Sequence, residues 1–381
     1  MDYSFDHPIE RRGTASFKWD LHGGDLLPLW VADMDFASPP QVVEALESRA
    51  AHCVYGYSLV PDSLVEAIVR HLDRRYGWRI DGDWLVWLPS VVPGLNLACD
   101  AFCAPDEAVL TITPVYPPFL EAPPQRGRRL ATVPAEEHDG HWELPLDGLE
   151  AAVGPDTRVL FFCHPHNPLG RVWRREEVVA VVDFCRRHDL VLVSDEIHCD
   201  LVLDAIEHVP AGLACPGDAD RIVTLMSPSK TFNLPGLNFA FAVVADTALR
   251  RRFLAPGQDL EYALGYGLLN PGPGGQEQGI DQGPGWARDA GPGRRLGPGC
   301  PEELLHLRGY RRFKAGLHLS RQAGGRVRQP AHPDPHGRGL PLVGHRPGDV
   351  PEVPGSQTFA HPPALVLGLG PVQEALLLQI G

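Results

Sequence analysis

The residues of this sequence best suited to chemistry stand directly after short apolar runs. The runs at 108–113, 159–163, 190–194 and 222–226 are each followed by a polar cluster, and these clusters contain, in chain order, Tyr116, Asn167, Asp195 with His198, and Ser227, Ser229 and Lys230. A partly desolvated lysine can act as a neutral, nucleophilic amine. A lysine on its own is usually a solvated surface residue, so a reactive role for Lys230 requires elements that enclose it.

The apolar runs are short and rich in Val and Ile, which indicates buried β-strands. Between and before them, the segments 41–49, 63–76 and 176–188 have the amphipathic pattern of helices. This alternation predicts an α/β fold with a mostly parallel sheet and helices on both faces. Ligands of open α/β sheets bind outside the carboxyl ends of the strands, so we expect the four polar clusters to converge on one pocket.

Composition narrows the range of partners. The 381 residues carry a net charge of −14, which disfavours nucleic acid and anionic membrane surfaces as partners. No run of about twenty apolar residues is present, and residues 1–20 do not resemble a signal peptide, so a cytoplasmic protein is expected. The eight cysteines lie mostly in apolar stretches and are expected to be reduced and buried. Their spacing does not indicate a metal site.

Several motifs together resemble one family. They are WVADMDF at 30–36, YGY at 55–57, VVPG at 91–94, HNP at 166–168, DEIH at 195–198 and SPSKTFNLPG at 227–236. The chain resembles fold-type I enzymes that depend on pyridoxal 5'-phosphate (PLP), in the aminotransferase class I/II group. Within that group it is similar to the MalY/PatB-type C–S lyases, or cystathionine β-lyases. The resemblance extends over about residues 1–265.

The resemblance implies a set of roles around PLP. Lys230 would condense with the cofactor aldehyde, and Asp195 would keep the pyridine nitrogen protonated so that the ring withdraws electrons. Asn167 would bind the ring oxygen and Tyr116 would stack on the ring face. The phosphate would lie at the start of a helix over 95–102, with binding residues Val92, Pro93, Gly94, Ser227 and Ser229. By resemblance, Tyr55 reaches the phosphate of a neighbouring subunit, which implies a homodimer.

Each of these residues also has a simpler interpretation. Asp195 could be a helix N-cap, Asn167 a turn residue before proline, and Tyr116 a core or loop aromatic. His198 is either a catalytic acid/base or a structural histidine.

Two departures from the aminotransferase pattern favour a lyase. Gly236 is followed by Leu237 and Asn238, where many aminotransferases have a phosphate-binding Arg. The Asp-x-x-Tyr of those enzymes is Asp195-Glu-Ile-His198 here. The resemblance therefore implies α,β-elimination of cystathionine or cysteine S-conjugates to thiol, pyruvate and ammonia. An aminotransferase and an inactive product of a disrupted gene remain as alternatives.

The last third of the chain has a different composition. Gly and Pro fill 42 of the 127 positions from 255 onward, against 37 of the 254 before. The sequence predicts an arm and part of a small domain over 1–50, a large PLP-binding domain over 51–265, and a Gly/Pro-rich tail over 266–381. Either the tail is a disordered extension or a shifted reading frame has replaced the C-terminal domain, and the abrupt change favours the second. The family's substrate-carboxylate Arg, in an Arg-Leu-Asn-Phe-like setting, has no counterpart in this tail.

Overall fold

A computed structural model describes residues 5–7, 9–22, 26–55 and 58–257 of the chain. The predicted tail over 266–381 lies outside the described residues, as do Gly56 and Tyr57 of the YGY motif. Among the residues that are described, no helix has the combined length and apolar character needed to cross a membrane.

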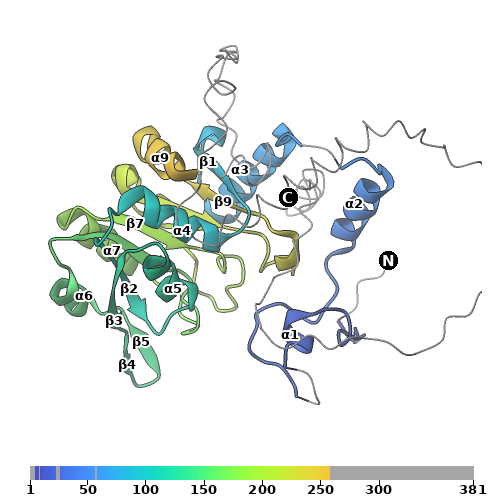
Figure 1. Cartoon of the computed structure of the whole chain (residues 1–381), viewed down its shortest axis with the longest axis horizontal. Helices are drawn as coiled ribbons and strands as arrows, with labels where there is room; N and C mark the ends of the chain where they lie inside the picture. Colours follow the sequence, from blue (N-terminus) through green and yellow to red (C-terminus); the bar gives the residue numbers. More distant parts are fainter. Residues whose placement is uncertain (1–4, 8, 23–25, 56–57, 258–381) are drawn as a thin grey trace, which may run out of the picture. The chain divides into compact units, whose positions relative to one another are not determined.

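A seven-stranded sheet forms the centre of the described chain (Figure 1). Its order is β1-β9-β8-β7-β6-β2-β3, and only β9 runs against its neighbours. The strands are β1 (Leu85–Leu88), β2 (Ala108–Thr113), β3 (Arg129–Pro134), β6 (Thr157–Cys163), β7 (Val191–Asp195), β8 (Ile222–Met226) and β9 (Ala240–Val243). A small hairpin, β4 (Glu136–His138) with β5 (His141–Glu143), follows β3. The mostly parallel α/β architecture that the sequence predicted is confirmed.

Helices cover both faces of this sheet. Alternate strand residues pack in two clusters: one contains apolar residues of α4, α5 and α9, and the other those of α6, α7 and α8. A third cluster joins α3 to β1, β8 and β9. The helices are α1 (Phe17–Asp20), α2 (Pro40–Ala51), α3 (Asp62–Tyr76), α4 (Val91–Phe102), α5 (Pro118–Gln125), α6 (Leu146–Ala152), α7 (Arg175–Arg187), α8 (Ala211–Ala214) and α9 (Thr247–Leu254). Since both faces are covered, the central strands are apolar throughout, as in other buried parallel sheets.

The four predicted strands appear as β2, β6, β7 and β8, and the three predicted helices as α2, α3 and α7. Two boundaries differ in ways that affect the site. Asp195 is the last residue of β7 and does not follow the strand. The helix expected over 95–102 begins four residues earlier, at Val91, with Ser90 as its N-cap.

Candidate active site

The parallel register brings the predicted polar clusters to one edge of the sheet. Tyr116 follows β2, Asn167 follows β6, Asp195 ends β7, and Lys230 follows β8. The backbone N–H of Tyr116 donates to the carbonyl of Asn167 at 3.0 Å, which joins the first two loops. The carboxyl end of β1 lies at the same edge and leads into α4. The clusters therefore lie at one edge of the sheet, and their convergence on a single pocket stays a prediction.

Asp195 is a buried carboxylate with one oxygen committed. Asp195 is only 3% exposed, and its Oδ1 accepts a hydrogen bond from the Ile197 N–H at 3.1 Å. Its Oδ2 has no hydrogen-bond partner among the described residues. Burial raises the pKa of Asp195 to about 7, and the charge of Lys230 opposes that rise. An unpaired carboxylate oxygen in such a position is suited to a cationic N–H, such as the protonated ring nitrogen of PLP.

Glu196, the next residue, is completely buried and fixes the segment that carries Asp195. Its Oε1 accepts from the Ser194 hydroxyl at 2.8 Å and from the Ala211 N–H at 2.9 Å. Its Oε2 lies 2.7 Å from Nε2 of His208. Burial raises the pKa of Glu196 and lowers that of His208. These partners orient the backbone on both sides of Asp195 and were not found by sequence reasoning.

A second histidine extends this buried network. The ring of His164 stacks on that of His208, with centroids 4.3 Å apart. The Nε2–H of His164 donates to the carbonyl of Val209 at 3.1 Å. Burial and the neighbouring His208 lower the pKa of His164 to about 3, so the ring is neutral at ordinary pH. His164 is therefore a buried, uncharged ring that packs against His208.

Lys230 lies in a partly buried position where its charge is disfavoured. Burial lowers its pKa, and the charges of Asp33 and Asp195 oppose that effect, Asp33 being the larger. Asp33 comes from the N-terminal arm and was not among the predicted site residues. His198 is half-buried, and burial together with the charge of Lys230 lowers its pKa to about 4. His198 is consequently neutral at neutral pH, which leaves both its catalytic and its structural interpretation open.

The two serines before Lys230 hold the turn that presents it. The Ser227 Oγ lies 2.6 Å from the carbonyl oxygen of Phe239 and 2.8 Å from the Ser229 Oγ. The Ser229 N–H donates to the Ser227 Oγ at 3.1 Å. A hydroxyl has a single proton, and the carbonyl of Phe239 can only accept that of Ser227. The Ser229 hydroxyl then donates to the Ser227 Oγ, so Ser229 can donate to a phosphate only by turning away from Ser227.

The start of α4 refines the predicted phosphate site. Val92 is the second helical residue and has an N–H outside the intrahelical pattern, whereas Pro93 has no N–H. Gly94 is the fourth helical residue, and a Cβ there would lie 3.0 Å from Leu88 and 3.1 Å from Leu225. Gly94 therefore serves the close packing of α4 on the sheet. Ser90 makes no side-chain cap hydrogen bond, which adds its hydroxyl to the available donors.

The two tyrosines of the predicted site are both exposed to solvent. Tyr116 is 40% exposed, and burial and the Asp195 charge raise its pKa. Tyr55 is 54% exposed, and its hydroxyl donates to the carbonyl of Ala50 at 2.9 Å. Its contact with a neighbouring subunit stays a prediction.

Two cavities are lined by residues of the predicted site. One of about 600 Å³ is lined by Lys230, Asp33 and Asn233, and another of about 400 Å³ by Asn167 and His198. A cavity of about 730 Å³ lies elsewhere, beside Trp78 and Thr224. The part of the chain that the structure describes contains no group of three or more His, Cys, Asp or Glu residues able to hold a metal ion.

Comparison with known proteins agrees with this geometry. Residues 25–255 match the family model for class I and II aminotransferases. The cystathionine β-lyase PatB of Bacillus subtilis is 37% identical over 258 residues, which cover 66% of this chain and 67% of that protein. The arginine–pyruvate transaminase AruH of Pseudomonas aeruginosa is 31% identical over 256 residues, or 64% of each chain.

A solved structure shows the same fold with its cofactor. Cystalysin from Treponema denticola, which contains pyridoxal 5'-phosphate, superimposes with a TM-score of 0.66 at 32% identity, covering 71% of this chain and 70% of that one. The chain spans about two thirds of the length of the relatives it matches. Its donor set fits PLP: an amine, an opposed carboxylate, a flanking phenol and a helix start. The chain belongs to the class I and II aminotransferase family of PLP-dependent enzymes.

Proposed function

We propose that this protein is a PLP-dependent carbon–sulfur lyase that converts cystathionine or cysteine S-conjugates to thiol, pyruvate and ammonia. The observation that carries the proposal is the placement of Lys230 and the buried Asp195 at one sheet edge, together with two departures from the aminotransferase sequence pattern. Asn238 stands where many aminotransferases have an Arg, and His198 where they have a Tyr. Similarity to PatB supports the same assignment.

Each residue of the site has a separate role in the proposed reaction. PLP, when bound, supplies the electron sink for charge that develops at the substrate α-carbon. The Oδ2 of Asp195 would hold the proton on the ring nitrogen, and Tyr116 would contact the ring. Ser229, Ser90 and the Val92 N–H would bind the phosphate. Lys230 Nζ takes the proton from the substrate α-carbon, after which the Cβ–S bond breaks and the thiolate leaves.

The lowered pKa of Lys230 is consistent with this role. An amine removes a proton only in its neutral form, and burial increases the neutral fraction at neutral pH. The nearby carboxylates limit this effect, so that the amine can hold the proton once it has been transferred. Burial favours the neutral form of Lys230, and the two carboxylates favour its protonated form. A lysine with both influences is suited to a reversible proton transfer at carbon.

The experiment measures products with and without a keto acid. The full chain, and a fusion in which the C-terminal third of PatB replaces residues 258–381, are loaded with PLP and given cystathionine. We expect the fusion to release pyruvate and thiol in equal amounts without 2-oxoglutarate, and Lys230→Ala to abolish both. We expect little turnover from the unfused chain, because the family's substrate-carboxylate Arg has no counterpart in its tail. Strict dependence on 2-oxoglutarate would contradict the lyase assignment.

An aminotransferase is the second candidate, and the 31% identity to the transaminase AruH favours it. The same lysine and aspartate would serve that reaction, so the distinction depends on the fate of the amino group. In the assay above, a transaminase would consume 2-oxoglutarate and form glutamate, whereas a lyase would release ammonia.

A further inference from the structure

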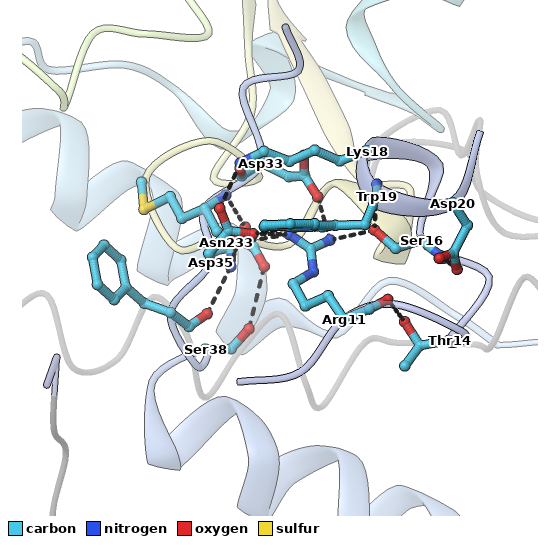
Figure 2. Close-up of polar contacts among 12 residues, drawn as sticks. Arg11, Thr14, Ser16, Lys18, Trp19, Asp20, Asp33, Asp35, Ser38 and Asn233 are labelled. Atoms are coloured by element: carbon cyan, nitrogen blue, oxygen red, sulfur yellow. Dashed lines mark hydrogen bonds and ion pairs between the residues drawn. The ribbon is translucent and has the colours of Figure 1, made fainter. Parts of the chain in front are cut away.

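The N-terminal arm contains a polar cluster built around Arg11, Asp33 and Asp35 (Figure 2). Arg11 donates from Nη1 to Asp35 Oδ1 at 2.7 Å and from Nη2 to Asp33 Oδ2. Asp35 also accepts from Lys18 Nζ at 2.8 Å and from Trp19 Nε1 at 2.8 Å. Both oxygens of Asp35 are therefore occupied within the arm.

Asp33 differs from Asp35 in one respect. Its Oδ1 is buried and has no hydrogen-bond partner among the described residues, although its Oδ2 is paired with Arg11. Its side chain is only 14% exposed. A buried carboxylate oxygen without a partner costs free energy, so its presence requires an explanation.

The arm is attached directly to the loop that carries Lys230. Asn233 accepts from the Met34 N–H at 2.9 Å, and its Nδ2 donates to the carbonyls of Met34 at 3.0 Å and Phe36 at 2.9 Å. The Ser38 hydroxyl donates to the Asn233 carbonyl at 3.2 Å. These bonds fix the backbone next to Asp33 against Asn233, which is three positions after Lys230. Figure 2 shows the contacts of Asn233 and, separately, those of Asp33.

Asp33 and Lys230 line the same cavity of about 600 Å³, whose other charged lining residues are Glu10, Arg11 and Asp35. The charged and titratable groups that act on or respond to Lys230 are Asp33 from the arm, Asp195 from the end of β7, and His198 from the loop after β7. Burial lowers the pKa of Lys230, and the charge of Asp33 is the largest influence that raises it. Asp35 does not act on Lys230 in this way, although it shares Arg11 with Asp33.

We propose that Asp33 is a positioning residue for Lys230, a fixed negative charge that Arg11 orients and that stabilises the lysine ammonium after Lys230 has taken the substrate α-proton. This inference rests on the proposed function for the identity of the proton. Asp33 neither accepts nor donates that proton: the C–H bond breaks, an N–H bond forms on Nζ, and the carboxylate balances the new charge. Asp195 is committed to the cofactor ring, so the arm supplies the counter-charge on the substrate side.

The test measures the lysine without cofactor or substrate. The sequence contains three lysines, Lys18, Lys230 and Lys314, so competitive labelling with acetic anhydride followed by mass spectrometry reports each one separately. We expect Asp33→Asn to lower the pH midpoint of Lys230 labelling by roughly 0.5 to 1 unit, because a nearby opposite charge has been removed. The matched control is Asp35→Asn, which should leave the Lys230 midpoint unchanged and increase the labelling of Lys18.

A third variant separates charge from loss of structure. Asp33→Glu keeps the negative charge and should return the Lys230 midpoint toward the wild-type value. If Asp33→Asn detaches the arm, Lys18 labelling rises as in Asp35→Asn. In that event the Lys230 midpoint of Asp33→Glu shows whether the negative charge alone accounts for the shift. An unchanged Lys230 midpoint in a folded Asp33→Asn protein, or equal shifts in the Asp33 and Asp35 variants, would overturn the proposal. Because no turnover is measured, failure of the lyase assay and failure of this inference are distinguishable.

Discussion

Replacing Asp195 by Asn tests the electrostatics of the site in the cofactor-free protein. Burial raises the pKa of Asp195 from 3.8 to about 7. One pKa unit corresponds to about 1.4 kcal/mol, so ionising this carboxyl in the folded chain costs about 4 kcal/mol relative to the unfolded chain. The Asn side chain keeps an oxygen that can accept from the Ile197 N–H, and it has no ionisation.

The sign of the pH dependence follows from linkage. Below about pH 4 the carboxyl is protonated in both the folded and the unfolded chain, so Asp195 adds no pH-dependent term. Between about pH 4 and pH 7 the unfolded chain ionises first, and the wild-type protein loses stability. The Asn variant does not lose stability in this way, because Asn does not ionise. Its buried amide N–H group lowers the free energy of unfolding by about 1–3 kcal/mol at every pH. The free energy of unfolding of the variant minus that of the wild type should therefore rise by about 4 kcal/mol from pH 4 to pH 8.

Urea unfolding of the full-length chain at pH 4.5, 6 and 8 measures this difference. Asp83→Asn is the matched control, because Asp83 is exposed and precedes the amino end of β1, at the opposite edge from the site. Added PLP should stabilise the wild type more than Asp195→Asn at pH 8, since a ligand that binds only the folded state stabilises it more when it binds more tightly. A difference that does not change with pH, or equal stabilisation by PLP, would refute the reasoning.

The parts of the site that depend on local signals were predictable. Each strand that ends in a functional residue is a short apolar run, and parallel strands necessarily present their carboxyl ends at one edge. Tyr116, Asn167, Asp195 and Lys230 could therefore be grouped from their positions alone, and the structure places the strand ends that precede or contain them at one edge of the sheet. The family motifs added their roles, which no local pattern contains.

Long-range polar pairing was not predictable in the same way. Glu196 and His208, or Asp33 and the loop of Asn233, are brought together by the tertiary fold, and no periodicity in the sequence links them. The position of β9, inserted antiparallel between β1 and β8, likewise depends on the path of the chain.

Two internal prolines do not prevent helix α5 from forming. Pro123 and Pro124 lie within this helix, where proline is unfavourable, yet the helix forms with Phe119 and Ala122 buried against the core. Tertiary burial outweighs the local preference there.

Two further predictions concern Lys230 and the arm. Borohydride reduction of the PLP-loaded chain should attach PLP to Lys230 and not to Lys18 or Lys314, as peptide mass spectrometry would show, and label on either of the others would remove Lys230 from its role. Asn233→Gly keeps the left-handed backbone at φ 58° but removes three hydrogen bonds to the arm. At about 1 kcal/mol each, docking of the arm should weaken by about 2–3 kcal/mol, and the Met34 amide should exchange about 30–150-fold faster in hydrogen-exchange mass spectrometry. The central Val193 amide serves as the control, because its protection depends on the sheet and should not change. Unaltered protection at Met34 would mean that Arg11, which donates to the Met34 carbonyl at 3.1 Å, holds the arm without Asn233.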